Sequence, residues 1–395
     1  MKKGLGRIVK GFFGLKIRFW AMLLACILCV GVTYGLTVQR ERGRIGSEDN
    51  YNQAMKYLEI KHVIDQNYVG TVDENAVSAA AFAAMVDALG DQWSYYMSPS
   101  EYQAYRLYSQ NQYVGIGVTF DKDASTGGLK ILAVSSGSPA ANAGLASGDI
   151  IMSVAGQDVT GLTVGDARSI INENLGESVT LHVLKNGKDE ADVNVNCEAI
   201  YTNPVSSSMR GGNVGYVKIL NFQSGSAEAA IGAIETLLSQ GAQGFVFDVR
   251  MNPGGLLSEL NTLLDYLLPS GSMYITVDEN GTQTPVESNS LCLDLPMAVI
   301  VDADTFSAAE LFAASLQEYN WAEIVGARTT GKSRSQQTIE LSDGSAVHIS
   351  TGNYLTPLGV DLAEQGGVVP DQSVDLTATG DAQLDAAVAA VQWMM

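Results

Sequence analysis

The chain has 395 residues, more than one hydrophobic core usually organises, so two or three domains are expected. Hydrophobic residues make up 46% of it and 41 residues are glycine, which fits folded domains with many turns. The net charge is −20, but the first 44 residues hold nine of the 23 basic residues and one of the 43 acidic ones. The remainder is therefore strongly acidic and repels nucleic acid, so that class of partner is excluded.

Residues 19–39 form an uncharged and mostly apolar run. A helix of these 21 residues is about 31 Å long, enough to cross a hydrocarbon core of about 30 Å. Six basic residues precede the run and favour a cytoplasmic N-terminus. We therefore expect a single-pass protein of a bacterial-type cytoplasmic membrane, with residues 1–18 inside, an anchor at 19–39 and the remaining domains outside. A cleaved signal peptide, or lipidation at Cys26, stays open as an alternative.

The cysteines and histidines give no sign of a disulfide framework or a metal site. Two of the four cysteines, Cys26 and Cys29, lie inside the expected anchor, so Cys197 and Cys292 alone could form a bridge. The sequence has no Cys/His spacing typical of zinc ligands and no Walker-type phosphate motif. We expect neither a metal nor any other cofactor.

Residues 45–105 have a helical pattern, whereas residues 106–197 change to short strands and glycine turns. In the second region, 114–120 and 129–134 are predicted strands. The run Gly115-Ile-Gly-Val118 is followed further along by Ala143-Gly-Leu-Ala-Ser-Gly-Asp149. Glycine lets a backbone approach an anion, and a free strand edge accepts an extended peptide.

With these two motifs, the second region closely resembles a PDZ domain. The resemblance implies that the backbone N–H groups of Gly115, Ile116, Gly117 and Val118 capture the carboxylate of a peptide C-terminus.

Residues 198–375 alternate strands and helices, and residues 376–395 are expected to end the chain with a helix. Predicted strands lie at 214–219, 244–249 and 297–301, predicted helices at 227–238 and 256–268, and a hairpin at 339–349. This order of elements predicts a layered α/β core.

Ser307 and Lys332 are the residues in this core that suggest catalysis. Ser307 follows a predicted strand and begins a predicted helix, where free N–H groups and the helix dipole could stabilise an oxyanion. Its more ordinary role would be that of a helix N-cap. Lys332 lies on a later glycine-containing loop, where its ordinary role would be that of a solvated side chain. A lysine can deprotonate a serine if burial lowers its pKa from about 10.4 to roughly 7–8.

Three motifs together resemble the carboxyl-terminal processing protease family, also called tail-specific proteases. They are Asp248-Val-Arg-Met-Asn-Pro-Gly-Gly255, Ser307-Ala-Ala-Glu310 and Gly331-Lys-Ser-Arg-Ser-Gln336. The resemblance implies Ser307 as nucleophile, Lys332 as general base and Gln336 as its orienting partner. It also implies an oxyanion hole formed by the N–H of Ala308 and that of Gly254 or Gly255. The chain departs from the family pattern at Thr330, Ala309 and Ser333, none of which is a reacting group.

The expected protein is thus an α/β multidomain serine endopeptidase anchored in a membrane, with its catalytic domain outside the cytoplasm. Its parts are a helical region at 45–105, a PDZ domain at 106–197, a ββα, ClpP/crotonase-like peptidase core at 198–375 and a C-terminal helix at 376–395. Its substrates would be proteins or peptides with exposed C-terminal tails, and a homodimer stays open.

Three rival hypotheses are weaker. A Ser/His/Asp triad would depend on His348, for which an ordinary position in a strand is the simpler interpretation. A catalytically inactive PDZ adaptor on a protease-like core is the main alternative. An enzyme of acyl-CoA chemistry would use similar glycine-rich turns, but the PDZ domain and the exported topology argue against it.

Overall fold

A computed structural model describes residues 22–24, 26–37, 46–172, 174, 176–289, 292–375 and 380–395. The chain divides into two compact units, residues 1–81 and 82–395. The second unit holds both the PDZ-like region and the α/β core that the sequence predicts.

The described part of the predicted anchor is helical, over residues 22–24 and 26–37. The rest of it, and the whole segment 1–18, lie outside the described residues. No helix within the described ranges has both the length and the apolar character needed to span a membrane. Helices of the N-terminal region follow at α2 (Glu48–Asn67), α3 (Glu74–Asp87) and α4 (Pro99–Tyr108), with strand β1 (Tyr95–Met97) before α4.

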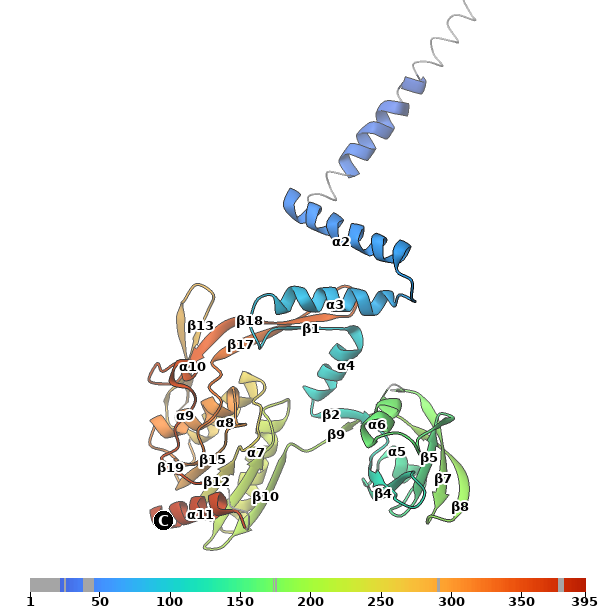
Figure 1. Cartoon of the computed structure of the whole chain (residues 1–395). Helices are drawn as coiled ribbons and strands as arrows, with labels where there is room; N and C mark the ends of the chain where they lie inside the picture. The colour runs from blue at the N-terminus through green and yellow to red at the C-terminus, as the bar shows by residue number, and fades with distance from the viewer. Residues whose placement is uncertain are drawn as a thin grey trace, which may run out of the picture. The chain divides into compact units, whose positions relative to one another are not determined.

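The region with PDZ-like motifs is an antiparallel sheet with two short helices (Figure 1). Its strands pair in the order β3-β4-β5-β7-β8, and β6 pairs with β5. The elements are β3 (Val118–Lys122), β4 (Leu129–Val134), α5 (Pro139–Asn142), β5 (Ile150–Val154), β6 (Gln157–Asp158), α6 (Val164–Asn172), β7 (Ser178–Lys185) and β8 (Asp189–Asn196). A two-stranded ladder of β2 (Gln112–Gly115) and β9 (Glu198–Tyr201) leads into and out of this region.

The predicted single strand at 114–120 is wrong in one respect. It is broken between β2 and β3, because Gly117 adopts a left-handed conformation with φ +81°. The break creates a loop at the motif expected to bind a carboxylate.

The core contains a six-stranded sheet in the order β10-β11-β12-β15-β16-β19. All neighbouring strands are parallel except β10 and β11. Its elements are β10 (Val205–Arg210), β11 (Val214–Ile219), α7 (Ser226–Ser239), β12 (Gly244–Asp248), α8 (Leu257–Leu267), β15 (Met297–Val301), α9 (Ala308–Glu318), β16 (Glu323–Gly326), α10 (Leu362–Gln365), β19 (Gln372–Ser373) and α11 (Ala382–Met394).

Alternating residues of the central strands face opposite sides of this sheet, as the strand repeat requires. Phe245 and Val299 pack with α7, α8 and α9, whereas Val246 and Ile300 pack with α11. Figure 1 shows α11 covering the face of the sheet opposite to these helices. Burial on both faces explains why β12 and β15 are continuously apolar until Asp248.

A second sheet of the core pairs β1 with β18, β18 with β17 and β13, and β13 with β14. Its remaining strands are β13 (Gly271–Val277), β14 (Gln283–Ser288), β17 (Arg334–Glu340) and β18 (Ala346–Leu355). The hairpin expected at 339–349 is therefore longer, and its second strand continues to Leu355. Strand β1 joins it from far upstream, with Tyr95 opposite His348.

The ends of β12 and β15 position the candidate catalytic segments. Because the two strands are parallel and adjacent, their C-terminal ends meet at one edge of the sheet. The turn after β12 is held by Arg250, which binds the fully buried Asp248 at 2.7 Å and Asp381 before α11 at 2.8 Å. Ser307 follows β15 at the same edge and precedes α9.

Candidate active site

Ser307 has an unusual backbone conformation for a residue with a side chain. Its φ is +62° and its ψ is −127°, a combination that favours glycine. Its N–H donates to Glu310 Oε2 at 2.9 Å, and its carbonyl accepts from the Glu310 N–H at 2.9 Å. The start of α9 thus holds Ser307 in a strained turn, as is common at functional sites.

Two backbone N–H groups beside Ser307 are free to meet an oxyanion. Within the described ranges, neither the N–H of Ala308 nor that of Gly255 donates to any protein acceptor. The N–H of Gly254 does, since it binds the Asn252 side-chain oxygen at 2.8 Å. A Cβ at Gly254 would lie 2.8 Å from the Ala308 nitrogen, so only glycine fits there. Of the two predicted glycine donors, Gly255 is therefore the free one.

Lys332 is buried, with 9% of its surface exposed, although its amine makes no hydrogen bond to another described residue. Gly331 allows this by taking a φ of +86° in a crowded loop, where a Cβ would lie 2.8 Å from the Gly367 nitrogen. Burial lowers the pKa of the Lys332 amine to about 8, against the opposing attraction of Asp91 and Glu310. Such an amine is partly neutral near physiological pH.

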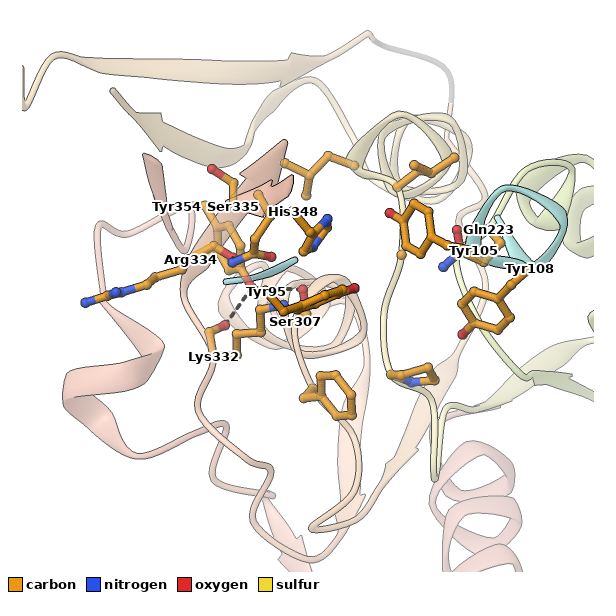
Figure 2. A pocket seen from close by; sticks show the side chains of 16 residues that line it. Tyr95, Tyr105, Tyr108, Gln223, Ser307, Lys332, Arg334, Ser335, His348 and Tyr354 are labelled. Atoms are coloured by element: carbon orange, nitrogen blue, oxygen red, sulfur yellow. Dashed lines mark hydrogen bonds between the residues drawn. The ribbon is translucent and has the colours of Figure 1, made fainter. Parts of the chain in front are cut away.

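Tyr354 lies between Ser307 and Lys332, whose side chains are not hydrogen-bonded to each other. Its phenol oxygen is 2.6 Å from the Lys332 carbonyl oxygen and 3.3 Å from Ser307 Oγ. A phenol carries one hydrogen and a carbonyl oxygen carries none, so the phenol must donate to Lys332. In the longer contact, the Ser307 hydroxyl therefore donates to the phenol oxygen of Tyr354. Figure 2 shows the three residues together on one side of the pocket.

Gln336 lines the same pocket, but within the described ranges it forms no hydrogen bond with the lysine amine. Its side-chain nitrogen donates to the Arg334 carbonyl and to Ser350 Oγ, each at 3.1 Å. The orienting contact that the resemblance implies is thus not formed in this structure.

Glu310 joins the serine turn to the lysine loop, a role that sequence reasoning did not assign. Its carboxylate is fully buried and accepts hydrogen bonds from Ser307 N, Thr329 Oγ1, Gly331 N and Lys332 N. The one available signal was the spacing Ser-x-x-Glu, which is typical of a helix capping box. The Glu310 carboxylate does more than cap the helix, because it also binds the backbone of Lys332, on a loop 22 residues away.

The pocket around these residues has a volume of 360 Å³. Ser307, Lys332, Gln336 and Tyr354 lie in its wall, and the other lining residues are Tyr95, Tyr105, Tyr108, Gln223, Pro253, Gly255, Leu256, Leu257, Phe306, Arg334, Ser335 and His348. In Figure 2, Tyr105, Tyr108 and Gln223 face the side that carries Ser307. The volume of the pocket is large enough to take a side chain next to the serine.

His348 does not form a triad with Ser307. Its Nδ1 lies 2.8 Å from Thr338 Oγ1, and its ring is tilted against Tyr95 at a centroid distance of 4.8 Å. Burial and the repulsion of Lys332 lower the pKa of His348 to about 4. It is therefore neutral near physiological pH.

The PDZ-like loop at 115–118 presents free donors of its own. The N–H groups of Ile116 and Gly117 have no protein acceptor within the described ranges. The carbonyl of Ile116 accepts a hydrogen bond from the Ala140 N–H, and the carbonyl of Gly117 accepts one from the Ser135 N–H. Val118 already belongs to β3, opposite Val134. The loop thus has the local form of an anion-binding site.

The strain at Ser307 predicts an order of stabilities for two substitutions. Ser307→Gly relieves a strain of about 1–3 kcal/mol but adds about 0.5–1 kcal/mol of unfolded-state entropy, whereas Ser307→Ala keeps the strain. We expect the free energy of unfolding of the glycine variant to exceed that of the alanine variant by about 1 kcal/mol, measured by urea denaturation. An alanine variant of equal or greater stability would contradict the strain.

Comparisons with known proteins agree with this architecture. The model of peptidase family S41 matches residues 213–374, and that of the PDZ domain matches residues 130–185. The chain is 27% identical to a carboxyl-terminal-processing protease of Synechocystis, over 94% of this chain and 92% of that protein. It is also 27% identical to the carboxy-terminal processing protease CtpA of Bacillus subtilis, over 92% of this chain and 78% of that one.

Among solved structures, the photosystem II D1 C-terminal processing protease is 25% identical, with a TM-score of 0.49 over 90% of this chain and 96% of that chain. The sheets and helices of this structure confirm the predicted α/β multidomain class, and the two family matches confirm its PDZ domain and its peptidase region. The chain thus contains a peptidase family S41 region and a PDZ domain, and over most of its length it is similar to carboxyl-terminal processing proteases.

Proposed function

We propose that this protein is a serine endopeptidase in which Ser307 is the nucleophile and Lys332 the general base. The observation that carries the proposal is the buried Lys332 amine, with its pKa lowered to about 8, on a loop that Glu310 ties to the strained Ser307 turn. A neutral amine at this place can accept the serine proton without any histidine.

The first step follows from the positions of these groups. Ser307 Oγ forms a bond to the scissile carbonyl carbon while its proton passes to Lys332 Nζ. The carbonyl π electrons move to the oxygen, which the N–H groups of Ala308 and Gly255 then bind. The lysine ammonium returns the proton to the leaving amine, which leaves an acyl-enzyme for water to hydrolyse.

The resting site must rearrange before this step. Ser307 Oγ has to leave Tyr354, and the Lys332 amine has to turn toward it, since no hydrogen bond joins the two side chains. Gln336 acts as an orienting partner only after its contacts to Arg334 and Ser350 are broken. Binding of a substrate in the pocket is the event that we expect to drive these changes.

The PDZ loop is the proposed receptor for substrate tails. The free N–H groups of Ile116 and Gly117 support it, because a C-terminal carboxylate needs such donors. The substrates are then proteins or peptides with exposed C-termini. The uncharged run at 19–39, flanked by basic residues, supports a membrane anchor with the catalytic domain outside the cytoplasm.

A tail-binding adaptor without activity is the second candidate. The observation in its favour is the absence of a hydrogen bond between Ser307 and Lys332 in this structure. Turnover of any unstructured reporter peptide that depends on Ser307 would exclude it.

The pH dependence of hydrolysis tests the proposed base. The Lys332 amine must be neutral to act, and about 1% of an amine with a pKa about 8 is neutral at pH 6. We expect kcat/KM for an unstructured peptide to rise about tenfold per pH unit below pH 7 and to reach half its maximum near pH 8. A midpoint near 4 would instead assign the base to His348, whose pKa is lowered to about 4. Lys332→Met should remove turnover at every pH.

Substitution of Gly117 tests the tail receptor. A Cβ at this position would lie 2.2 Å from the Ser138 Cβ, so Gly117→Ala must displace the loop. The matched control is Gly137→Ala, which carries similar left-handed strain at φ +73° but meets nothing within 4 Å. Fluorescence anisotropy with a labelled tail peptide should show at least a tenfold weaker affinity for the first variant alone. Equal affinity of the two variants for the tail peptide would contradict the proposal. So would an unchanged affinity of the wild-type protein for a peptide with an amidated C-terminus.

A further inference from the structure

Trp93 lies against the amine of Lys332, although it is not among the residues that line the pocket. The centre of its ring is 4.5 Å from Lys332 Nζ, a distance typical of a cation–π contact. Trp93 comes from the segment between α3 and β1, more than 200 residues upstream of the lysine. The reacting amine therefore lies between the pocket on one side and an indole ring on another.

Hydrogen bonds hold the Trp93 segment in place. The Asp91 carboxylate accepts from the backbone N–H of Trp93 at 3.3 Å and from Ser94 Oγ at 2.6 Å. Ser94 Oγ in turn accepts from the Ser350 N–H of β18 at 3.0 Å. The ring also stacks on Phe306, the neighbour of Ser307, with 6.0 Å between centroids. The indole is thus fixed relative to both the lysine and the serine.

The other charged and titratable groups around the amine come from several elements. Asp91 and Glu310 favour its protonated form, and Asp91 is itself paired with Arg334 of β17 at 3.1 Å. His348 and Tyr354 of β18 also lie close. Burial lowers the pKa of His348 and raises that of Tyr354, so both are neutral between pH 6 and pH 9. Within the described ranges the amine forms no ion pair with Asp91 or Glu310, whereas the indole ring contacts it directly.

We propose that Trp93 is a positioning residue for Lys332, which holds the lysine ammonium on its ring face and keeps water from the neutral amine. The inference rests on the proposed function, in which Lys332 gains a proton from Ser307 and later releases it. The ammonium formed in that step has a defined partner on Trp93, and the neutral amine is free to turn toward Ser307. A ring contact suits this exchange, because it is weaker than an ion pair and does not trap the proton.

The two parts of this role change the pKa of Lys332 in opposite directions. Trp93→Leu keeps an apolar cover but loses the attraction of the ring for the ammonium, so the pKa should fall. Trp93→Ala opens the amine to water, which stabilises the ammonium, so the pKa should rise toward its usual value. A side chain with only a packing role would not produce shifts of opposite sign.

Direct titration of Lys332 tests the proposal without depending on turnover. The protein is labelled with ¹³C,¹⁵N-lysine, and the Nζ and Cε chemical shifts of Lys332 are assigned by their loss in Lys332→Met. We expect the midpoint to fall by about 0.5–1 pH unit in Trp93→Leu and to rise by about one unit in Trp93→Ala. Trp393→Leu is the control, since this tryptophan is 88% exposed on α11 and should change nothing.

The outcomes separate this inference from the proposed function. Unchanged midpoints, or shifts of the same sign in both Trp93 variants, would overturn the role of Trp93 and leave Lys332 as base. A Lys332 midpoint that follows the predictions in a protein without hydrolytic activity would support the Trp93 contact and contradict the peptidase. In an active protein, the acid limb of the kcat/KM profile should move with the titrated midpoint in each variant.

Discussion

The buried carboxylate of Glu310 is the group on which the rest of the site depends. The candidate nucleophile and base lie on separate segments, one after β15 and one after β16, and among the described hydrogen bonds none joins the two side chains. Glu310 joins them by accepting hydrogen bonds from the backbone of Ser307 and of Lys332. A buried charge is costly unless donors surround it, so this carboxylate also prevents either segment from moving away alone.

The same arrangement accounts for the electrostatics. Lys332 is hydrogen-bonded to Tyr354 of β18 and contacts the Trp93 ring, and burial lowers the pKa of its amine although Glu310 and Asp91 oppose the change. The Glu310 carboxylate accepts hydrogen bonds from backbone N–H groups and none from the amine within the described ranges. The site thus has a carboxylate that provides rigidity and an amine that can still be neutral.

Local patterns predicted much of the fold and singled out the two candidate reacting residues. The apolar runs of β12 and β15, and the Asn-Pro-Gly-Gly turn between a strand and a helix, are visible in the sequence because each depends on neighbouring residues. Trp93 and Tyr354 could not be predicted in this way, since their roles depend on contacts between segments far apart in the chain. The expected Gln336 contact came from spacing alone, and spacing does not determine which of several acceptors an amide finds.

The substitution Glu310→Gln tests the link between the two segments most directly. The amide keeps the shape of the carboxylate but presents an N–H₂ group to backbone donors, so the serine turn and the lysine loop should separate. Glu318→Gln, at the half-buried C-terminal end of the same helix, is the control, since its carboxylate accepts from the Leu358 N–H at 2.7 Å and not from the serine turn or the lysine loop. The account predicts that kcat/KM for an unstructured peptide falls by at least about 100-fold in the first variant and stays unchanged in the second. A folded Glu310→Gln variant with activity within about twofold of the wild type would contradict it.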